Sequence, residues 1–290
     1  METKQSTLAN FNSEISKKSS ISTKRIWDRF DFGARYAKIF IKSLESGTFP
    51  LLPGPDGILN INGAYDMRTN NLHHGISQLM LKIRQAMLNS DSCAFISDET
   101  LQKARTHNID CYVIKGEIGF DIAIPKASDL EVKRWFCESQ LTKPENLKIF
   151  LAAEQQRNAS EKQKWYDKTS PSKTAIDASL KNPNRENTGI LECTAKTPEE
   201  YLGQVFVAMS TGNALKISKE ISDMFIEKTI AYLKQEHKPG TINKLAIYKL
   251  ASMANNYCKN YLYEKNKQEQ KKLRKQKIIV KRKPSYERSI

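Results

Sequence analysis

The sequence is poor in the cysteine patterns that build disulfide frameworks and metal sites. Its five cysteines are odd in number and far apart, and none forms a Cys-x-x-Cys pair. Closely spaced cysteines are typical of secreted disulfide scaffolds and of structural zinc sites. The pattern therefore argues against both and favours a reducing cytoplasm. The five are Cys93, Cys111, Cys137, Cys193 and Cys258.

Histidine is also scarce. Only His107 and His237 accompany the adjacent pair His73 and His74, and no carboxylate stands beside that pair at a ligand spacing. A metal site needs three or four convergent ligands, and a catalytic site needs groups in complementary roles. We therefore expect no metal, no cofactor and no enzymatic activity.

Long apolar runs are missing as well. The first residues lack the hydrophobic segment of a signal peptide, and no stretch approaches the roughly 20 apolar residues of a membrane-spanning helix. The sequence therefore predicts a cytoplasmic protein without a membrane partner.

Acidic residues are outnumbered by basic ones. The chain has 47 Lys and Arg against 32 Asp and Glu, a net charge of +15, which favours an acidic partner such as nucleic acid. Residues 259–290 hold twelve basic and three acidic residues, so they supply +9 of that charge. Such a tail would neutralise phosphates, although a solvated helix extension that aids solubility would look the same. The candidate phosphate-binding residues are Lys271, Lys272, Arg274 and Lys275.

Composition and periodicity predict an α+β N-terminal domain, with helices and a small mainly antiparallel sheet, followed by a small all-α C-terminal domain. The first residues and the stretch around 161–196 are polar and charged, which is typical of disorder and of linkers. The predicted segments are a disordered N-terminus (1–23), the α+β domain (24–160), a linker (161–196), a three-helix domain (197–263) and a basic tail (264–290).

Residues 69–124 form the centre of the predicted α+β domain. An entrance rich in Asn and His precedes apolar residues at Ile76, Leu79, Met80 and Ile83, which share one face of a helix. Ser97, followed by two acidic residues, predicts a second helix start.

The sequence also predicts a β-hairpin and an internal strand. A turn-forming segment with Gly116 and Gly119 separates an apolar run at 112–114 from an alternating run at 120–124, which predicts a β-hairpin. A second apolar run, at 147–152, predicts an internal strand. In the C-terminal half, Thr197 and Pro198 predict a capped helix start and Gly212 its end.

Polar residues gather before the first of these helices. Amides and an Arg beside an aromatic ring suit phosphates and base edges, but Asn is equally common in turns, where it tolerates left-handed conformations. Both interpretations fit the sequence. Lys115 is a further candidate phosphate ligand, although a hairpin turn explains it as well. The candidate residues before the helix are Tyr65, Arg68, Asn70, Asn71 and His73.

Four motifs resemble, in order, the N-terminal domain of the ArdC-type antirestriction proteins. The Leu-Glu-x-Gly-Thr-x-Pro element of that family matches residues 44–50, and its Tyr-x-Gly-Ile-Asn-x-Leu-Leu-Leu core is matched in part by residues 73–81. Its Val-x-Lys-Gly-Glu-x-Gly hairpin corresponds to residues 113–119, and its Val-Phe-Asn-x-Glu-Gln strand is echoed at 149–155. Leu51, His73 and Ser77 depart from the family pattern.

The resemblance implies a single-stranded-DNA-binding domain of a plasmid or other mobile element, acting in conjugation, antirestriction or DNA protection. ArdC-type proteins usually continue into a metallopeptidase-like domain with a His-Glu-x-x-His motif, which this sequence lacks. The departures keep an alternative open, in which the chain is an adaptor for conjugation or restriction proteins and its DNA binding is vestigial.

Overall fold

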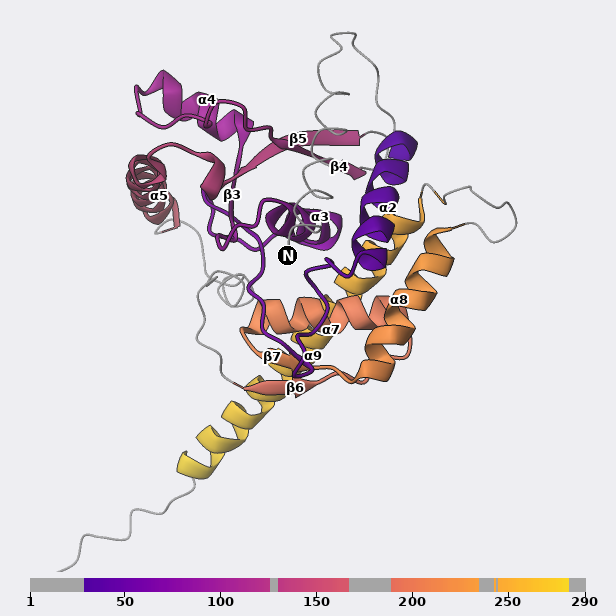
Figure 1. Ribbon diagram of the computed structural model, residues 1–290. Helices are drawn as coiled ribbons and strands as arrows, with labels where there is room; N and C mark the ends of the chain where they lie inside the picture. Colours follow the sequence, from indigo (N-terminus) through magenta and orange to yellow (C-terminus); the bar gives the residue numbers. More distant parts are fainter. Residues whose placement is uncertain (1–28, 126–129, 167–188, 235–242, 244, 282–290) are drawn as a thin grey trace, which may run out of the picture.

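The computed structural model describes residues 29–125, 130–166, 189–234, 243 and 245–281 (Figure 1). The predicted disordered N-terminus, most of the predicted linker and the end of the basic tail lie outside these residues. The elements are α2 (Arg29–Glu45), β1 (Ile58–Leu59), β2 (Tyr65–Asp66), α3 (Gly75–Met87), β3 (Ala94–Ser97), α4 (Asp98–Thr106), β4 (Phe120–Pro125), β5 (Leu130–Cys137), a 3-10 turn η1 (Glu138–Gln140), α5 (Pro144–Tyr166), β6 (Ile190–Glu192), α7 (Pro198–Thr211), β7 (Ala214–Lys216), α8 (Lys219–Leu233) and α9 (Ala246–Lys281).

The N-terminal part contains a four-stranded sheet with the strand order β2-β3-β5-β4. The short strand β2 runs parallel to β3, whereas β5 pairs antiparallel with both β3 and β4. The longest strand pairing is that of β4 with β5, which runs from Phe120 opposite Trp135 to Pro125 opposite Leu130. This part is therefore α+β with a mainly antiparallel sheet, and a helical region follows it, as the sequence predicts.

A second, three-stranded sheet connects distant parts of the chain. Its order is β1-β7-β6, so residues 58–59 pair with residues from the C-terminal region. The Tyr201 hydroxyl also donates a hydrogen bond of 2.8 Å to the backbone carbonyl of Leu51. The helical C-terminal region thus carries two short strands, which the sequence did not predict.

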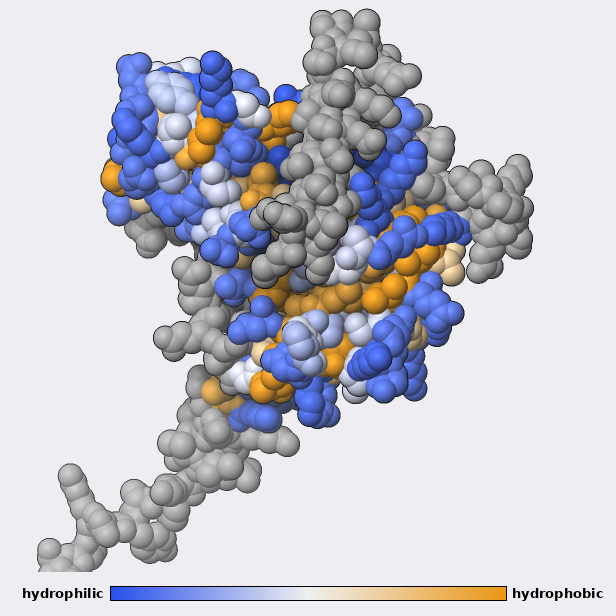
Figure 2. Space-filling view, viewed as in Figure 1, coloured by the Kyte–Doolittle hydropathy of each residue, from blue (hydrophilic) through white to orange (hydrophobic). Residues whose placement is uncertain are grey.

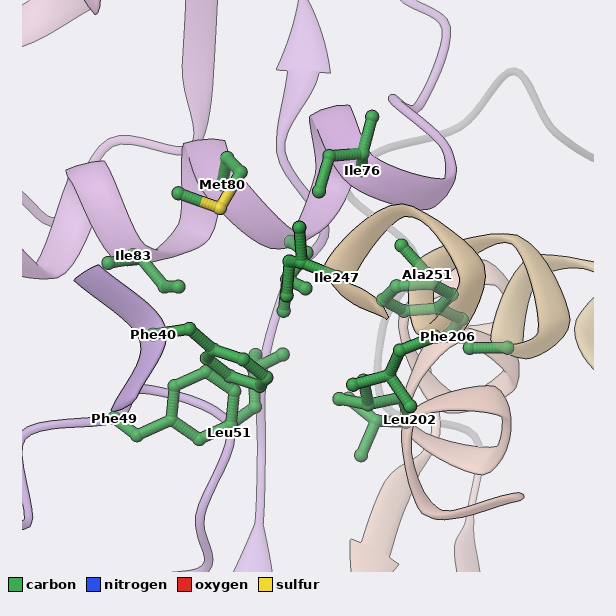
Figure 3. Close-up of a cluster of buried hydrophobic side chains, with 14 of the residues drawn as sticks. Phe40, Phe49, Leu51, Ile76, Met80, Ile83, Leu202, Phe206, Ile247 and Ala251 are labelled. Atoms are coloured by element: carbon green, nitrogen blue, oxygen red, sulfur yellow. The ribbon is translucent and has the colours of Figure 1, made fainter. Parts of the chain in front are cut away.

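One hydrophobic cluster includes side chains from both regions. Figure 3 shows Phe40 of α2, Met80 of α3, Leu202 of α7 and Ile247 of α9 meeting in it, all of them buried. The rings of Tyr201 and Phe225 stack with centroids 4.0 Å apart and join α7 to α8. The helices at 29–45 and 75–87 therefore bury their apolar faces against the C-terminal helices.

Local signals place several helix ends correctly. The Ser97 side chain accepts a hydrogen bond from the N–H of Thr100 and caps α4, and Thr197 caps α7 in the same way through Glu200. Gly212 ends α7 with a φ of 70°, a left-handed conformation that glycine adopts without a steric penalty. Both starts and this end are confirmed.

The predicted hairpin between 112–114 and 120–124 is wrong. Residues 120–125 pair with β5, and Val113 makes only an isolated bridge to Leu141. Six residue pairs join β4 to β5, whereas the run at 112–114 could offer three at most. The longer pairing satisfies more backbone groups, so it displaces the local one.

The predicted strand at 147–152 is also wrong, because these residues lie in α5. Leu147 and Leu151 are buried while Ile149 is 70% exposed. Burial at i and i+4 with exposure between them is the pattern of an amphipathic helix. Among the helices that the structure describes, none is long and apolar enough to cross a membrane.

Candidate nucleic-acid interface

Four of the candidate residues lie on one turn at the edge of the four-stranded sheet. Tyr65 bridges Leu72, which closes a loop that we call the sheet-edge turn (residues 65–72). The N–H of Asn70 donates to the carbonyl of Asp66, and the N–H of Asp66 donates to the carbonyl of Asn71. The turn is therefore a tightly hydrogen-bonded unit, in which Tyr65, Arg68, Asn70 and Asn71 are close neighbours.

The carboxylate of Asp66 organises the inside of this turn. It accepts hydrogen bonds from the backbone N–H of Arg68 at 3.0 Å and from the hydroxyl of Thr69 at 3.1 Å. Burial raises the pKa of Asp66, and these two bonds oppose that effect. Since both of these hydrogen bonds stay inside the turn, Asp66 stabilises the backbone geometry of the turn.

The two asparagines of the turn have different roles. Asn70 has a φ of 54°, the left-handed conformation that Asn tolerates better than most residues. Asn71 is exposed, and its N–H donates to the Thr69 hydroxyl at 3.3 Å. The backbone of Asn70 therefore fits the interpretation that Asn serves the turn, while Asn71 is exposed and accessible to a ligand.

Arg68 supplies an exposed positive charge at the turn. Its backbone carbonyl accepts a hydrogen bond from the Gln155 side chain of α5 at 2.5 Å, which ties the turn to that helix. No carboxylate in the described part of the chain forms an ion pair with its guanidinium. Two lysines of the same region are paired, Lys148 with Glu138 and Lys103 with Glu154.

Tyr65 is half-buried on β2. Burial is the main cause that raises the pKa of its phenol, and the nearby carboxylate of Glu138 acts in the same direction. An acidic group beside an aromatic ring repels phosphate but still permits stacking of a base on the ring.

His73 directly follows the turn in sequence and is half-buried, with its ring packed against the core. The imidazole meets the ring of Trp135 edge-on, with centroids 4.5 Å apart and planes at 87°. Its Nε2 atom is buried and has no hydrogen-bond partner in the described part of the chain. Burial lowers the pKa of His73 to about 4, with His74 adding to the effect, so the ring is neutral at pH 7.

Lys115 occupies a separate turn. It is exposed, and the N–H of Glu117 closes the turn by donating to the carbonyl of Ile114. The backbone of Ile114 is in turn bonded to the carbonyl of Gln140, beyond the end of β5. Within the described residues, no hydrogen bond or ion pair links Lys115 to the sheet-edge turn.

The remaining candidates lie on α9, which extends well past the predicted end of the helical domain. We call residues 246–258 its inner half and residues 259–281 its outer half. The outer half holds nine Lys or Arg and two Glu, a net charge of +7. Lys271 and Lys272 are exposed; Arg274 and Lys275 are helical, but their side chains lie outside the described part. Figure 1 shows this half projecting away from the body of the molecule.

Aromatic rings accompany these cations, a feature that the sequence reasoning missed. Tyr261 is 40% exposed and Tyr263 is 59% exposed. The Nζ of Lys267 lies 6.0 Å from the centroid of the Tyr263 ring. The signal was present in the sequence as tyrosines and lysines at helical spacings, but it becomes visible only once the helix is known to continue through this segment.

The surface of the body is uneven in character. Figure 2 shows mainly hydrophilic surface over the α4–α5 end, and apolar surface near the place where α2, α7 and α8 meet. Among the residues that the structure describes, no three His, Cys, Asp or Glu side chains converge in a way that could hold a metal ion.

Comparison with known proteins gives one structural similarity. No protein-family model and no curated protein matches the sequence. Among solved structures, the chain is similar to the metal-free crystal structure of the antirestriction protein ArdC from plasmid R388. The TM-score is 0.40 at 12% sequence identity, and the match covers 79% of this chain and 96% of that one. A similarity of this size does not assign the chain to that family.

Proposed function

We propose that this chain is a non-enzymatic single-stranded-DNA-binding protein of a mobile genetic element, acting in conjugation, antirestriction or DNA protection. The observation that carries the proposal is the outer half of α9, a projecting helical segment with a net charge of +7 and two exposed tyrosines. A cationic helix of this kind attracts polyphosphate and releases its counterions.

The inner half of α9 makes that cationic segment a fixed part of the molecule. A Cβ atom added to Gly203 of α7 would lie 2.7 Å from the Cβ of Tyr257, so the two helices touch closely at that point. Ile247, Leu250 and Ala251 are buried in the shared core. The outer half therefore leaves the body along a direction that core packing sets.

The preference for unpaired strands rests on two supports. One is the sequence resemblance to the ArdC-type N-terminal domain. The other is the pairing of aromatic rings with cations, because bases that are free of a duplex stack on Tyr at about 1–3 kcal/mol each. Tyr261, Tyr263 and Tyr65 offer such rings, while Arg68, Lys115, Lys271 and Lys272 offer phosphate ligands.

Fluorescence anisotropy tests the proposal. A labelled oligothymidine and a duplex of the same length are titrated with the full chain at two salt concentrations. We expect tighter binding of the unpaired strand, and weaker binding of both at the higher salt. Equal affinity for the two forms would contradict the strand preference and leave only general polyanion binding.

A second candidate is an adaptor that docks on conjugation or restriction proteins. The observation that favours it is the sheet-edge turn, in which Asp66 and Asn70 serve the backbone of the turn itself. In that case the cationic helix would bind unpaired and duplex DNA alike, without a preference for the unpaired strand. The anisotropy experiment therefore separates the two candidates.

A further inference from the structure

A buried lysine lies on α3 without an acidic partner. Lys82 is only 4% exposed, and no carboxylate in the described part of the chain lies within ion-pair distance of it. Its Nζ donates to the side-chain oxygen of Gln85 and to the sulfur of Cys93, the latter at 3.6 Å. A buried ammonium without a counter-charge is costly, so this amine needs an explanation.

The sulfur of Cys93 stands at the junction of α3 and β3. It accepts N–H groups from Lys82 and, at 3.5 Å, from the amide of Gln85. Cys93 is partly exposed, whereas the other four cysteines are buried. A small oxidant therefore reaches this thiol more easily than any other in the chain.

The neighbouring thiol of Cys137 has different surroundings. Its sulfur lies 3.4 Å from the Ser90 hydroxyl and 3.5 Å from the Ser92 carbonyl. No hydrogen bond in the described part of the chain links it to Cys93. The amine of Lys82, by contrast, is in direct hydrogen-bond contact with the Cys93 sulfur.

We propose that Lys82 and Cys93 form a covalent nitrogen–sulfur cross-link after a peroxide oxidises the thiol. In the first step the thiol takes one oxygen from the peroxide, giving a sulfenic acid, and the peroxide is reduced to water. In the second step the lone pair of Nζ attacks sulfur, the S–O bond breaks, and hydroxide leaves with one proton of the amine as water. The product is a sulfenamide, and the two steps together release two water molecules from one hydrogen peroxide.

The surroundings of Lys82 prepare it for this attack. Burial lowers the pKa of Lys82 and so favours the neutral amine, although the nearby Cys93 and Cys137 sulfurs oppose the shift. The 3.6 Å contact is already close to the roughly 3–3.5 Å from which bond formation proceeds. The backbone carbonyl of Cys93 accepts the N–H of Tyr65 at 3.0 Å, so the cross-link would form beside the sheet-edge turn.

Peptide mapping of the full chain tests the proposal. The folded protein is treated with hydrogen peroxide, its free thiols are alkylated, and it is digested with and without dithiothreitol. We expect a linked peptide pair that contains Lys82 and Cys93, lighter than the sum of its parts by two hydrogens, with no trypsin cleavage after Lys82. Dithiothreitol should release it. A disulfide between Cys93 and Cys137, a bridge that retains the oxygen, or a Cys93 that stops at higher oxides would overturn the proposal.

Variants separate the amine from the thiols. Cys137→Ser should leave the cross-link intact, whereas it would abolish a Cys93–Cys137 disulfide, which removes the same two hydrogens from the intact chain. Lys82→Met should raise dimedone labelling of Cys93 several-fold, because the sulfenic acid is no longer consumed. Lys249→Met, on an exposed lysine of α9, is the matched control and should leave the labelling unchanged. The wild-type peptide map decides the question even if the Lys82 variant folds poorly.

Discussion

The two halves of α9 belong to one continuous helix, yet they differ in burial and in charge. Along the inner half a stripe of side chains at helical spacing enters the core that α7 and α3 share. Along the outer half no side chain from residue 259 to residue 273 is buried, and cations dominate. The buried stripe consists of Ala246, Ile247, Leu250, Ala251, Ala254 and Cys258.

We therefore expect substitutions in the two halves to affect different properties, stability in the inner half and binding affinity in the outer half. The inner half contributes apolar burial, so substitutions there should unfold the protein and affect binding only indirectly. The outer half contributes charge, so substitutions there should change affinity and leave the free energy of unfolding nearly unchanged. The sheet-edge turn belongs to the body of the molecule, where a substitution should lower stability if it disturbs the fold and should weaken the strand preference if it removes a contact with a base.

The largest expected effect is on stability. Leu250→Ala removes a side chain that is 1% exposed, and it should lower the free energy of unfolding by about 2–5 kcal/mol. Leu273→Ala makes the same change in the outer half, where the side chain is 56% exposed, and should cost less than about 0.5 kcal/mol. Urea denaturation followed by circular dichroism measures both. Similar losses for the two variants would break the comparison.

The second prediction concerns how the stability of the protein depends on pH through His73, a residue of the body. The pKa of His73 is about 4 in the folded chain against an ordinary value of 6.5, so the unfolded chain takes up this proton first as the pH falls. Stability should therefore fall between pH 6.5 and pH 4, by up to about 3 kcal/mol from this group. His73→Phe should flatten that part of the profile, measured by urea denaturation at several pH values. The exposed His107, changed to Phe, is the control; an unchanged slope in the His73 variant would contradict its burial.

The third prediction concerns the cations of the outer half. Replacing Lys271 and Lys272 together by Gln should lower affinity for an unpaired oligonucleotide roughly 10–30-fold at about 0.1 M salt, and should reduce the salt slope by about 1.4. Lys219 and Lys249, exposed on α8 and on the inner half, provide the matched double control. If the control variant lost as much affinity, the charge effect would be spread over the molecule and not carried by the outer half.

The smallest expected effect is at the sheet-edge turn. Asn70→Ala places a Cβ-bearing residue without a local hydrogen-bonding group at a φ of 54°, which should cost about 1–2 kcal/mol of stability. Asn70→Gly should cost little, because glycine adopts this conformation freely. Thermal unfolding and anisotropy are compared for the two variants. A loss of binding in the stable Gly variant would show that the Asn70 amide contacts the ligand.

Local signals in the sequence predicted a good part of this fold. The caps at Ser97 and Thr197, the stop at Gly212 and the apolar stripe from Ile76 to Ile83 all act within a few residues, so a short window contains the information. The α+β character of the first region and the helical character of the second follow from these elements.

Strand partners could not be read in this way, because pairing is decided by residues far apart. The run at 120–124 has an alternating pattern, but nothing in it specifies β5 over the nearer 112–114. The pairing of Leu59 with Leu215 is more distant still. Leu147 and Leu151 show the opposite difficulty, since a short apolar run fits a strand or a helix until its burial is known.

The candidate site was predicted unevenly for the same reason. Tyr65, Arg68, Asn70 and Asn71 are neighbours in sequence, so a single turn keeps them together. Lys115 shares no described contact with that turn, and the cations at 271–275 lie on an extension of the last helix, a possibility that the sequence left open beside a basic tail. Whether these residues bind nucleic acid stays a prediction.

The central claim is that the cations beyond Tyr263 supply affinity for phosphate, while the rest of the chain, with Tyr65, Tyr261 and Tyr263, supplies the preference for unpaired strands. Its most direct test compares the full chain with a chain that ends at Tyr263, titrating each into labelled unpaired and duplex DNA of equal length. We predict that the shortened chain binds both more weakly and still prefers the unpaired strand. A shortened chain that binds neither form, or both equally, would contradict the claim.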